Sequence, residues 1–334
     1  MIISRTPFRV SFFGGGTDYP VWYREHGGAV ISTSINKYCY INCRHLPPFF
    51  PYHYRIRYTK SELTQTVDEI VHPSVRECLK FMRINRGVEI QHNADLPAMS
   101  GLGSSSTFTV GLLHALHSLT GHITNKRQLA LDAVHVEQDL IGENVGSQDQ
   151  VIAAFGGFNR ISFGGPQNIL VQPITISDTK LTMLQDHLML LYTGFQRVAS
   201  EIVGEQIENT PVRTAELTTM MELVEEAMNV LNRETADMED FGRLLHEQWM
   251  VKRSMTDLIS NSLIDEMYET GRRAGAIGGK LLGAGGGGFL LFFVRPGIRP
   301  TVRKALQKLL HVPFRFENLG SQIIYYTPEE NHYE

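Results

Sequence analysis

The chain has 334 residues, of which 42% are hydrophobic and 20% are charged, and its formal net charge is −4 at pH 7. This composition is typical of a globular protein with a substantial core, and the small negative charge gives no electrostatic case for nucleic acid or a membrane surface as a partner. Arg5 and Arg9 interrupt the apolar start, so it is a poor signal peptide, and apolar runs such as 289–294 are too short to cross a bilayer. Three cysteines without zinc-ligand spacing predict a reducing, cytoplasmic location.

The first half of the chain predicts strands mixed with helices. Alternating and β-branched residues predict strands at 8–13, 52–59 and 87–94, and a pair of strands within 27–46. Apolar spacing predicts helices at 74–86, from 107 to Gly121, and at 125–142.

The second half predicts more helix. Helical spacing recurs near 198–209, 213–233, 241–260, 262–274 and 300–311, with strands at 289–294 and 321–327. Glycine and proline are frequent between residues 165 and 180, which predicts a boundary between 1–172 and 173–334. We therefore predict an α+β fold in two lobes.

The segment 97–110 (PAMSGLGSSSTFTV) places three consecutive serines between a glycine pair and an apolar helix. One serine suffices as an N-cap, and the others could simply fill the turn. Several hydroxyls beside the free N–H groups of a first helical turn instead favour a phosphate site, with one hydroxyl reaching a magnesium ion. The segment is not a Walker A loop, because the chain has no matching glycine–lysine pattern, and it lacks the third glycine of a dinucleotide fingerprint.

A second glycine-rich segment, 283–288 (GAGGGG), precedes the apolar run FLLFFV. It matches a dinucleotide fingerprint formally, but a strand is predicted where such a fold needs a helix. A nucleotide-dependent oxidoreductase, which is a rival interpretation, requires NAD(H) and that helix. A hairpin turn needs fewer glycines, so we favour close approach of this backbone to another segment or a ligand.

Two carboxylates stand out in segment 137–150 (EQDLIGENVGSQDQ). Glu137 is late on a predicted helix, and Asp149 is in a Gly-Ser-Gln loop. Glu137 could bind a metal ion, and Asp149 could take or orient the proton of an attacking hydroxyl. Spacing alone favours simpler roles, a solvated helix face for Glu137 and a turn cap for Asp149.

The turn 14–20 (GGGTDYP) presents Thr17 and Asp18 after three glycines. A carboxylate can accept hydrogen bonds from two neighbouring sugar hydroxyls. An Asx-type turn explains the same pattern equally well.

Taken together, these four segments resemble the GHMP superfamily of small-molecule kinases, such as galactokinase, homoserine kinase and mevalonate kinase. The order of segments matches from about residue 5 to residue 293, and "PAMSGLGSSS" and "KLLGAGGGGFLL" are similar to the family's nucleotide and third motifs. The resemblance implies ATP and Mg²⁺ as cofactors. It also implies the two-lobed GHMP kinase fold, with an N-terminal lobe like domain 2 of ribosomal protein S5 and a ferredoxin-like C-terminal lobe.

The resemblance further implies a nucleotide site. The loop from Gly101 to Ser106 would cradle the ATP phosphates, Gly283 to Gly288 would support it and close on the substrate, and Ser105 and Glu137 would hold magnesium. The residues implied to bind the cofactor are Pro97, Gly101, Leu102, Gly103, Ser104, Ser105, Ser106, Gly285, Gly286 and Gly287.

For the transfer itself, the resemblance implies that Asp149 is the catalytic base or a positioning carboxylate and that Arg9 lies near the acceptor hydroxyl and the γ-phosphate. Asp18 matches a sugar-binding aspartate, with Gly16 and Thr17 beside it. A phosphate already present on the substrate needs cations, and Arg197 is included in the predicted substrate site. The other available cations are Lys37, Arg44, Arg55, Arg57 and Arg160.

One departure from the family bears on the acceptor. Galactokinases carry Glu-His where this chain has Gly15 and Gly16, and "GGGTDYP" is similar to the branch of D-glycero-D-manno-heptose 7-phosphate kinases, with fucokinases as neighbours. The similarity to this branch implies a kinase that phosphorylates the anomeric hydroxyl of D-glycero-D-manno-heptose 7-phosphate. The product would be the 1,7-bisphosphate, which leads to nucleotide-activated heptose for surface glycan synthesis. Two alternatives are left open: fucose or galactose as the acceptor, and a catalytically silent sugar sensor on the same fold. The sequence also leaves a homodimer open.

Overall fold

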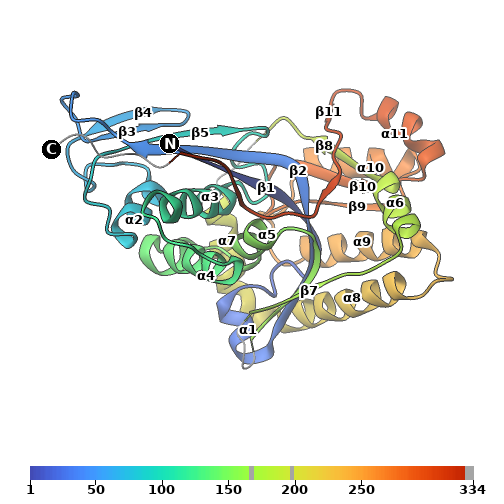
Figure 1. The fold of residues 1–334 in the computed structure, drawn as a ribbon. Helices are drawn as coiled ribbons and strands as arrows, with labels where there is room; N and C mark the ends of the chain where they lie inside the picture. The colour runs from blue at the N-terminus through green and yellow to red at the C-terminus, as the bar shows by residue number, and fades with distance from the viewer. Residues whose placement is uncertain (165–168, 196–198, 328–334) are drawn as a thin grey trace.

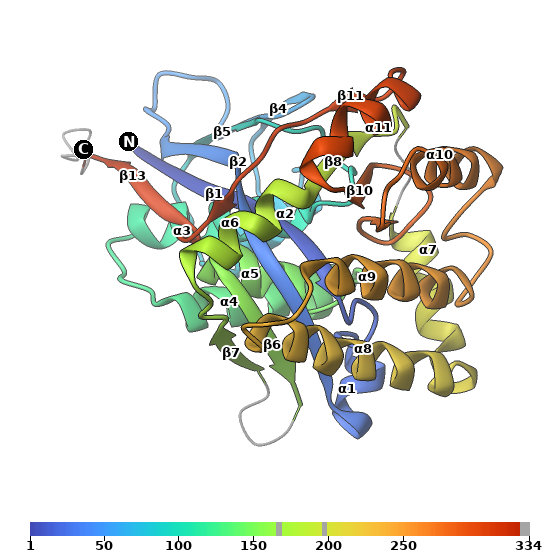
Figure 2. The ribbon, with the colours of Figure 1, turned by 90° about the vertical axis from the view of Figure 1, so that its right-hand side faces the viewer.

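The computed structural model describes residues 1–164, 169–195 and 199–327. Two β-sheets, each covered by helices, form two lobes that lie side by side (Figures 1 and 2). This is the two-lobed α+β arrangement that the sequence predicts. In the described part of the chain, no helix is both long and apolar enough to span a membrane.

The first sheet contains nine strands among the described residues, in the order β13-β1-β2-β5-β3-β4, with β6 and β12 paired to β2 and β7 paired to β6. All its pairings are antiparallel except that of β3 with β5. Its strands are β1 (Ile2–Phe13), β2 (Gly28–His45), β3 (Tyr54–Arg57), β4 (Ser61–Thr64), β5 (Val88–Ala94), β6 (Phe158–Phe163), β7 (Ile169–Pro173), β12 (Phe316–Glu317) and β13 (Gln322–Tyr326).

The predicted strand pair at 27–46 is wrong, because β2 is one continuous strand. Its first part, 28–33, pairs with β6, and its last part, 39–45, pairs with β5. Both halves therefore find partners without an intervening turn.

Helices cover one face of this sheet, and α3 packs directly on β1 and β2 (Figure 1). Gly111 of α3 permits this contact, because a Cβ there would lie 2.8 Å from Oγ1 of Thr6. The helical segments of this lobe are α1 (Pro20–His26), α2 (Pro73–Phe81), α3 (Ser104–Leu119), α4 (Lys126–His135), the π-helix η1 (Val136–Ile141) and α5 (Gln148–Phe155).

The second sheet is antiparallel and four-stranded over the described residues, in the order β11-β8-β10-β9. Strand β10 follows the glycine-rich segment directly, so the helix required by the oxidoreductase interpretation is not there. The elements of this lobe are α6 (Asp178–His187), β8 (Leu188–Tyr192), α7 (Ala199–Asn209), η2 (Thr210–Val212), α8 (Thr214–Asn232), α9 (Met238–Arg253), α10 (Ser262–Arg273), β9 (Gly278–Leu281), β10 (Phe289–Phe293), η3 (Pro296–Ile298), α11 (Arg299–Ala305) and β11 (Leu310–His311).

The last strands return to the first lobe. Strand β13 pairs with β1, and β12 pairs with β2. The predicted division at residue 172 placed both strands in the second lobe, and the structure corrects this. Local composition could not reveal it, because strand partners are chosen by contacts between residues about 280 to 320 positions apart.

Candidate active site

A cavity that is partly open to solvent brings the predicted segments together. Its walls come from β1, the turn before α1, the start of α5 and the glycine-rich segment after β9. A further wall is formed by residues 97–106, here called the serine loop, whose three serines form the first turn of α3. Residues from both ends of the chain therefore share one space, and ligand sites often form in such clefts.

Arg9 and Asp149 form the central ion pair of this cavity. Nε and Nη2 of Arg9 donate to the two carboxylate oxygens of Asp149, each over 2.7 Å, and Nη1 donates to the carbonyl of Gly101 over 2.7 Å. Arg9 is 5% exposed, and the Asp149 side chain is 23% exposed. The pair thus ties β1 to the serine loop and leaves part of the carboxylate facing the cavity.

Asp149 does not lie in the predicted loop. It occupies the first turn of α5, which begins at Gln148. The backbone N–H of Ser147 and of Gln148 both donate to Asp18, over 3.0 Å to its carbonyl and 3.3 Å to its carboxylate. These bonds fix the start of α5, so Asp149 is held on a helix instead of a mobile turn.

The serine loop has the geometry of an anion site. Gly101 and Gly103 adopt φ of +80° and +76°, which glycine tolerates best. The Ser104 hydroxyl accepts a bond from the Met99 N–H over 3.1 Å, and Ser105 is exposed at the cavity. The unpaired N–H groups at the start of the 16-residue helix α3 meet the cavity here, where a helix N-terminus favours negative charge.

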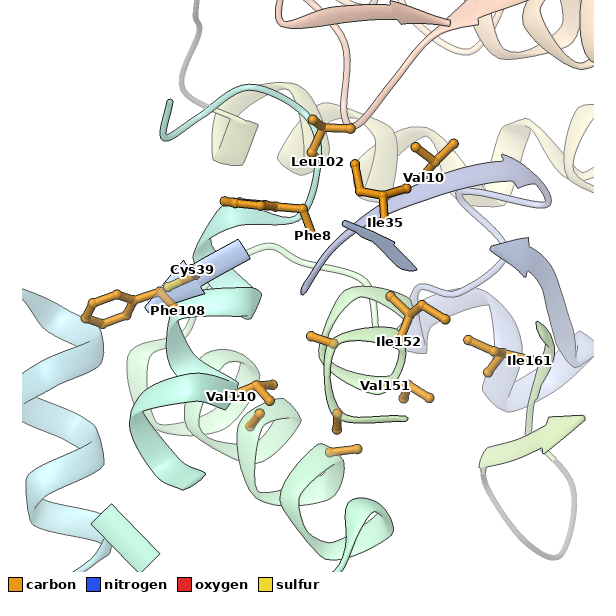
Figure 3. Packing of buried hydrophobic residues seen from close by; sticks show 14 of the residues in the cluster. Phe8, Val10, Ile35, Cys39, Leu102, Phe108, Val110, Val151, Ile152 and Ile161 are labelled. Carbon is orange, nitrogen blue, oxygen red and sulfur yellow. The ribbon is translucent and has the colours of Figure 1, made fainter. Parts of the chain in front are cut away.

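Two glycine-rich segments pack backbone to backbone behind this loop. A Cβ on Gly283 would lie 2.4 Å from Cα of Gly101, and one on Gly288 would lie 2.2 Å from the carbonyl oxygen of Ser100. This close approach explains why the segment needs more glycines than a hairpin turn. Leu102 anchors the loop in the buried core that includes Phe8 (Figure 3).

Not every residue predicted for the cofactor faces the cavity. Gly101, Gly103, Ser104, Ser105, Ser106, Gly285 and Gly287 line it. Leu102 is fully buried, Pro97 is exposed outside the cavity lining, and the N–H of Gly286 donates to the Ile259 carbonyl over 2.9 Å. These three residues shape the loops without facing the space.

Glu137 is completely buried in the π-helix η1, where it meets Ser106 instead of Ser105. The Ser106 hydroxyl donates to Oε2 of Glu137 over 2.7 Å, and the Gln150 amide also donates to Oε2. Oε1 of Glu137 has no hydrogen-bond partner among the described residues. Burial raises the pKa of Glu137 to about 7, against the lowering effect of the Thr109, Ser106 and Gln150 side chains.

The glycine turn places Asp18 at the cavity but not Thr17. The Asp18 carboxylate is 1% exposed and accepts bonds from the N–H of Gly16 and of Gln148, and burial raises its pKa. The Thr17 hydroxyl is buried within the turn, 2.8 Å from the Gly14 carbonyl, and is absent from the cavity lining. The Thr17 hydroxyl is thus used within the turn and does not face the cavity, unlike the side chain of Asp18.

Gly16 adopts φ of +113°, a conformation that other residues rarely tolerate. Gly15 has room for a larger residue, since the nearest atom to its ideal Cβ is Nε2 of Gln148 at 3.6 Å. The open turn at these positions is therefore fixed partly by the backbone and partly by the absence of side chains.

Sequence reasoning missed several polar residues that line the cavity, among them Ser11, Gln148, Lys252 and Lys280. Ser11 Oγ and Gln148 Oε1 are buried and have no hydrogen-bond partner among the described residues. Lys280 carries a sequence signal, because it is the one charged residue in the glycine and apolar run 277–294. Lys252 carries none, since it ends a helix that is charged throughout.

Those predicted cations for a substrate phosphate that the structure describes do not line the cavity. Arg44 and Arg55 both pair with Glu89, and Arg160 pairs with Glu225. Lys37 and Arg57 are likewise absent from the lining, and Arg197 lies outside the described residues. Over the described residues, the cations that line the cavity are Arg9, Lys252 and Lys280.

Two family models match this chain. The model of the GHMP kinase N-terminal domain matches residues 69–157, and the model of the GHMP kinase C-terminal domain matches residues 220–312, which together exceed half of the chain. The chain belongs to the GHMP kinases. It is therefore a phosphotransferase with an alcohol group as acceptor, and ATP is the phosphate donor of this family.

Individual relatives add detail. The chain is 28% identical over 324 residues to the D-glycero-alpha-D-manno-heptose 7-phosphate kinase of Campylobacter jejuni, covering 92% of this chain and 93% of that protein. It is 25% identical to the bifunctional fucokinase/GDP-fucose pyrophosphorylase of Arabidopsis thaliana, over 86% of this chain and 29% of that protein. Its fold matches the crystal structure of a D-glycero-D-manno-heptose 1-phosphate kinase from Bacteroides thetaiotaomicron with a TM-score of 0.72 at 23% identity, covering 98% of this chain and all of that chain.

Proposed function

We propose that this GHMP kinase transfers the γ-phosphoryl group of ATP to the anomeric hydroxyl of D-glycero-D-manno-heptose 7-phosphate, giving the 1,7-bisphosphate. The observation that carries the proposal is the Arg9–Asp149 pair, which lies in one cavity with the serine loop and an open glycine turn. The near full-length similarity to a heptose 7-phosphate kinase supports this acceptor. The product would serve the synthesis of nucleotide-activated heptose for a surface glycan.

The chemistry follows from these positions. The acceptor oxygen forms a bond to the γ-phosphorus, the bond from that phosphorus to the bridging oxygen breaks, and ADP leaves with the electron pair. Asp149 accepts a hydrogen bond from the acceptor hydroxyl and then its proton, because an ionised carboxylate has lone pairs beyond the two that Arg9 uses. Arg9 and the start of α3 supply fixed positive charge, which matters most when little covalent help is needed.

The open turn suits a large polyhydroxyl acceptor. Ser11 Oγ and Gln148 Oε1 form no hydrogen bond with any described residue, although both side chains lie buried at the cavity wall beside Gly15. Buried polar atoms normally have partners. Hydroxyls of the acceptor are suitable partners, and Asp18 lies on the same wall.

The residues present also fit a magnesium ion. Within the described part of the chain, one buried carboxylate oxygen of Glu137 has no hydrogen-bond partner, and serine hydroxyls lie nearby. Such oxygen ligands are the ones that Mg²⁺ prefers. We propose that Glu137 holds the ion together with Ser105 or Ser106. Bound there, the ion would neutralise charge on the ATP phosphates.

Alanine variants of the two serines distinguish them. Ser106→Ala removes the hydroxyl bonded to Glu137, so we expect a rise of about tenfold or more in the magnesium concentration needed for half-maximal turnover. Ser105→Ala should behave in the same way if Ser105 is the ligand, as the family resemblance implies. Magnesium titrations of turnover for both variants measure this, and unchanged titrations for both would remove the serines from the metal site.

The acceptor is tested by comparing kcat/KM for heptose 7-phosphate, unphosphorylated heptose, galactose and fucose. Charge-assisted hydrogen bonds to the 7-phosphate contribute roughly 1.5–3 kcal/mol each, so its loss should cost about tenfold or more in kcat/KM per contact. Heptose 7-phosphate should therefore be the best substrate. A kcat/KM for fucose or galactose equal to that for heptose 7-phosphate would keep the kinase but refute the heptose assignment.

A catalytically silent sugar sensor is the alternative of another class. It would bind ATP and a sugar without consuming ATP. The intact Arg9–Asp149 pair argues against it, because a sensor has no need of a carboxylate held at the acceptor position.

A further inference from the structure

Two lysines at the cavity wall are buried and have no carboxylate partner among the residues that the structure describes. Lys252, at the end of α9, is 6% exposed, and Lys280, on β9, is 2% exposed. Nζ of Lys252 donates to the carbonyl of Gly283, and Nζ of Lys280 donates to the carbonyl of Phe12 over 2.8 Å. No carboxylate among the described residues lies within ion-pair distance of either lysine.

Burying these two ammonium groups lowers the stability of the protein when no ligand is bound. A buried ammonium normally has a counter-charge, and each lysine here uses one of its three N–H donors on a carbonyl. Burial, with the charge of Arg9, lowers the pKa of Lys252 to about 8. Burial, with the charge of Lys252, lowers the pKa of Lys280 well below its usual range. Arg9, equally buried, differs because Asp149 neutralises it.

We propose that Lys252 and Lys280 bind phosphoryl oxygens in this cavity, and that the group they hold is the phosphoryl group being transferred. The inference rests on the proposed phosphoryl transfer but not on the identity of the acceptor. A multiply charged phosphoryl group supplies the counter-charge that both lysines lack and accepts their remaining N–H donors.

The position of Lys252 favours the transferring group. Its carbonyl partner, Gly283, packs against Gly101 of the serine loop, and the same Gly101 accepts a bond from Arg9. Lys252 is thus linked through two residues to the Arg9–Asp149 pair and to the loop that faces ATP. Charge on the non-bridging oxygens of the phosphoryl group is what fixed cations stabilise during the transfer.

The test uses Lys252→Met and Lys280→Met, which keep side-chain length and remove the charge. Calorimetry, without acceptor and at one magnesium concentration, gives Kd for ADP and for the ATP analogue with a β,γ-imido bridge. We expect each variant to bind the analogue about tenfold or more weakly while its Kd for ADP changes less than about threefold. Lys304→Met, an exposed lysine on α11, is the matched control and should change neither Kd.

A second measurement separates a ligand role from a structural one. The unliganded variants should melt at or above the Tm of the wild-type protein, because an unpaired buried charge is removed. If Lys252→Met does not fold, Lys252→Gln retains a donor for the Gly283 carbonyl without the charge and should show the same loss of analogue affinity. A normal affinity for the analogue in folded, charge-free variants refutes the assignment to the transferring group.

The phosphoryl oxygens could belong to the nucleotide or to the 7-phosphate of the acceptor, and binding of the acceptor distinguishes the two. Kd for heptose 7-phosphate and for unphosphorylated heptose is measured in the same variants. If the variants lose affinity only for the phosphorylated sugar and bind the analogue normally, the two lysines bind the acceptor phosphate. That result would overturn the assignment to the transferring group. If all four affinities are unchanged, the lysines bind no phosphoryl group. The nucleotide measurements need no sugar, so failure of the heptose assignment alone leaves them valid.

Discussion

Asp149→Asn should lower kcat by about 10²-fold or more while Kd for the ATP analogue stays largely unchanged. The substitution keeps the shape of the side chain but removes the charge that accepts the proton. It also leaves Arg9, which is 5% exposed, with one carbonyl oxygen in place of a two-pronged carboxylate. Steady-state kinetics with saturating ATP and calorimetry with the analogue measure the two effects separately.

Asp139→Asn is the matched control for this variant. Asp139 lies on the same acidic segment, but its side chain is 64% exposed and pairs with His135 outside the cavity lining. Its kcat should equal that of the wild-type protein. A near-normal kcat for Asp149→Asn would remove Asp149 from the catalytic set, whereas equal losses in both variants would point to a general effect of charge on this segment.

Gly283→Ala should displace the serine loop, because Gly283 packs against the backbone of Gly101 in that loop. The new Cβ would lie 2.4 Å from Cα of Gly101, and the φ of +77° at this position disfavours any side chain. The two backbones must separate, which shifts the serine loop and the carbonyl that Lys252 holds. We expect a loss of about 1–3 kcal/mol in the free energy of unfolding and a fall of about tenfold to 10²-fold in kcat/KM for ATP.

The comparison is Gly297→Ala, since Gly297 has no atom within 4 Å of the position of its ideal Cβ and does not have a positive φ. Its free energy of unfolding should stay within about 0.5 kcal/mol of the wild-type value, and its kinetics should not change. Chemical denaturation and ATP titrations of both variants give the result. If Gly283→Ala matches this control, close packing of the two glycine segments is not what positions the serine loop.

Local sequence predicted most elements of the fold. Helix α3 and strand β5 were predicted because apolar spacing and alternation are properties of neighbouring residues. Local sequence did not predict the elements α1, β4, α5, β6, β7, α6, β8, β9, β11 and β12. Apart from α6, each of these is too short to carry a clear period. Strand β2 was predicted as two strands because its length reflects its partners on both halves, which lie elsewhere in the chain.

The sequence by itself indicated the class of this protein, because the serine loop, the acidic segment and the glycine block occur in the order that resembles the GHMP kinases. It also predicted Arg9, Asp149 and Asp18 as site residues, and all three line the cavity. Only the tertiary structure decided that Ser106 meets Glu137, that Thr17 is used within the turn, and that Lys252 and Lys280 face the cavity. These facts depend on which side of a helix or turn faces the cavity and on contacts between distant segments, and neither is set by the residues next to each position.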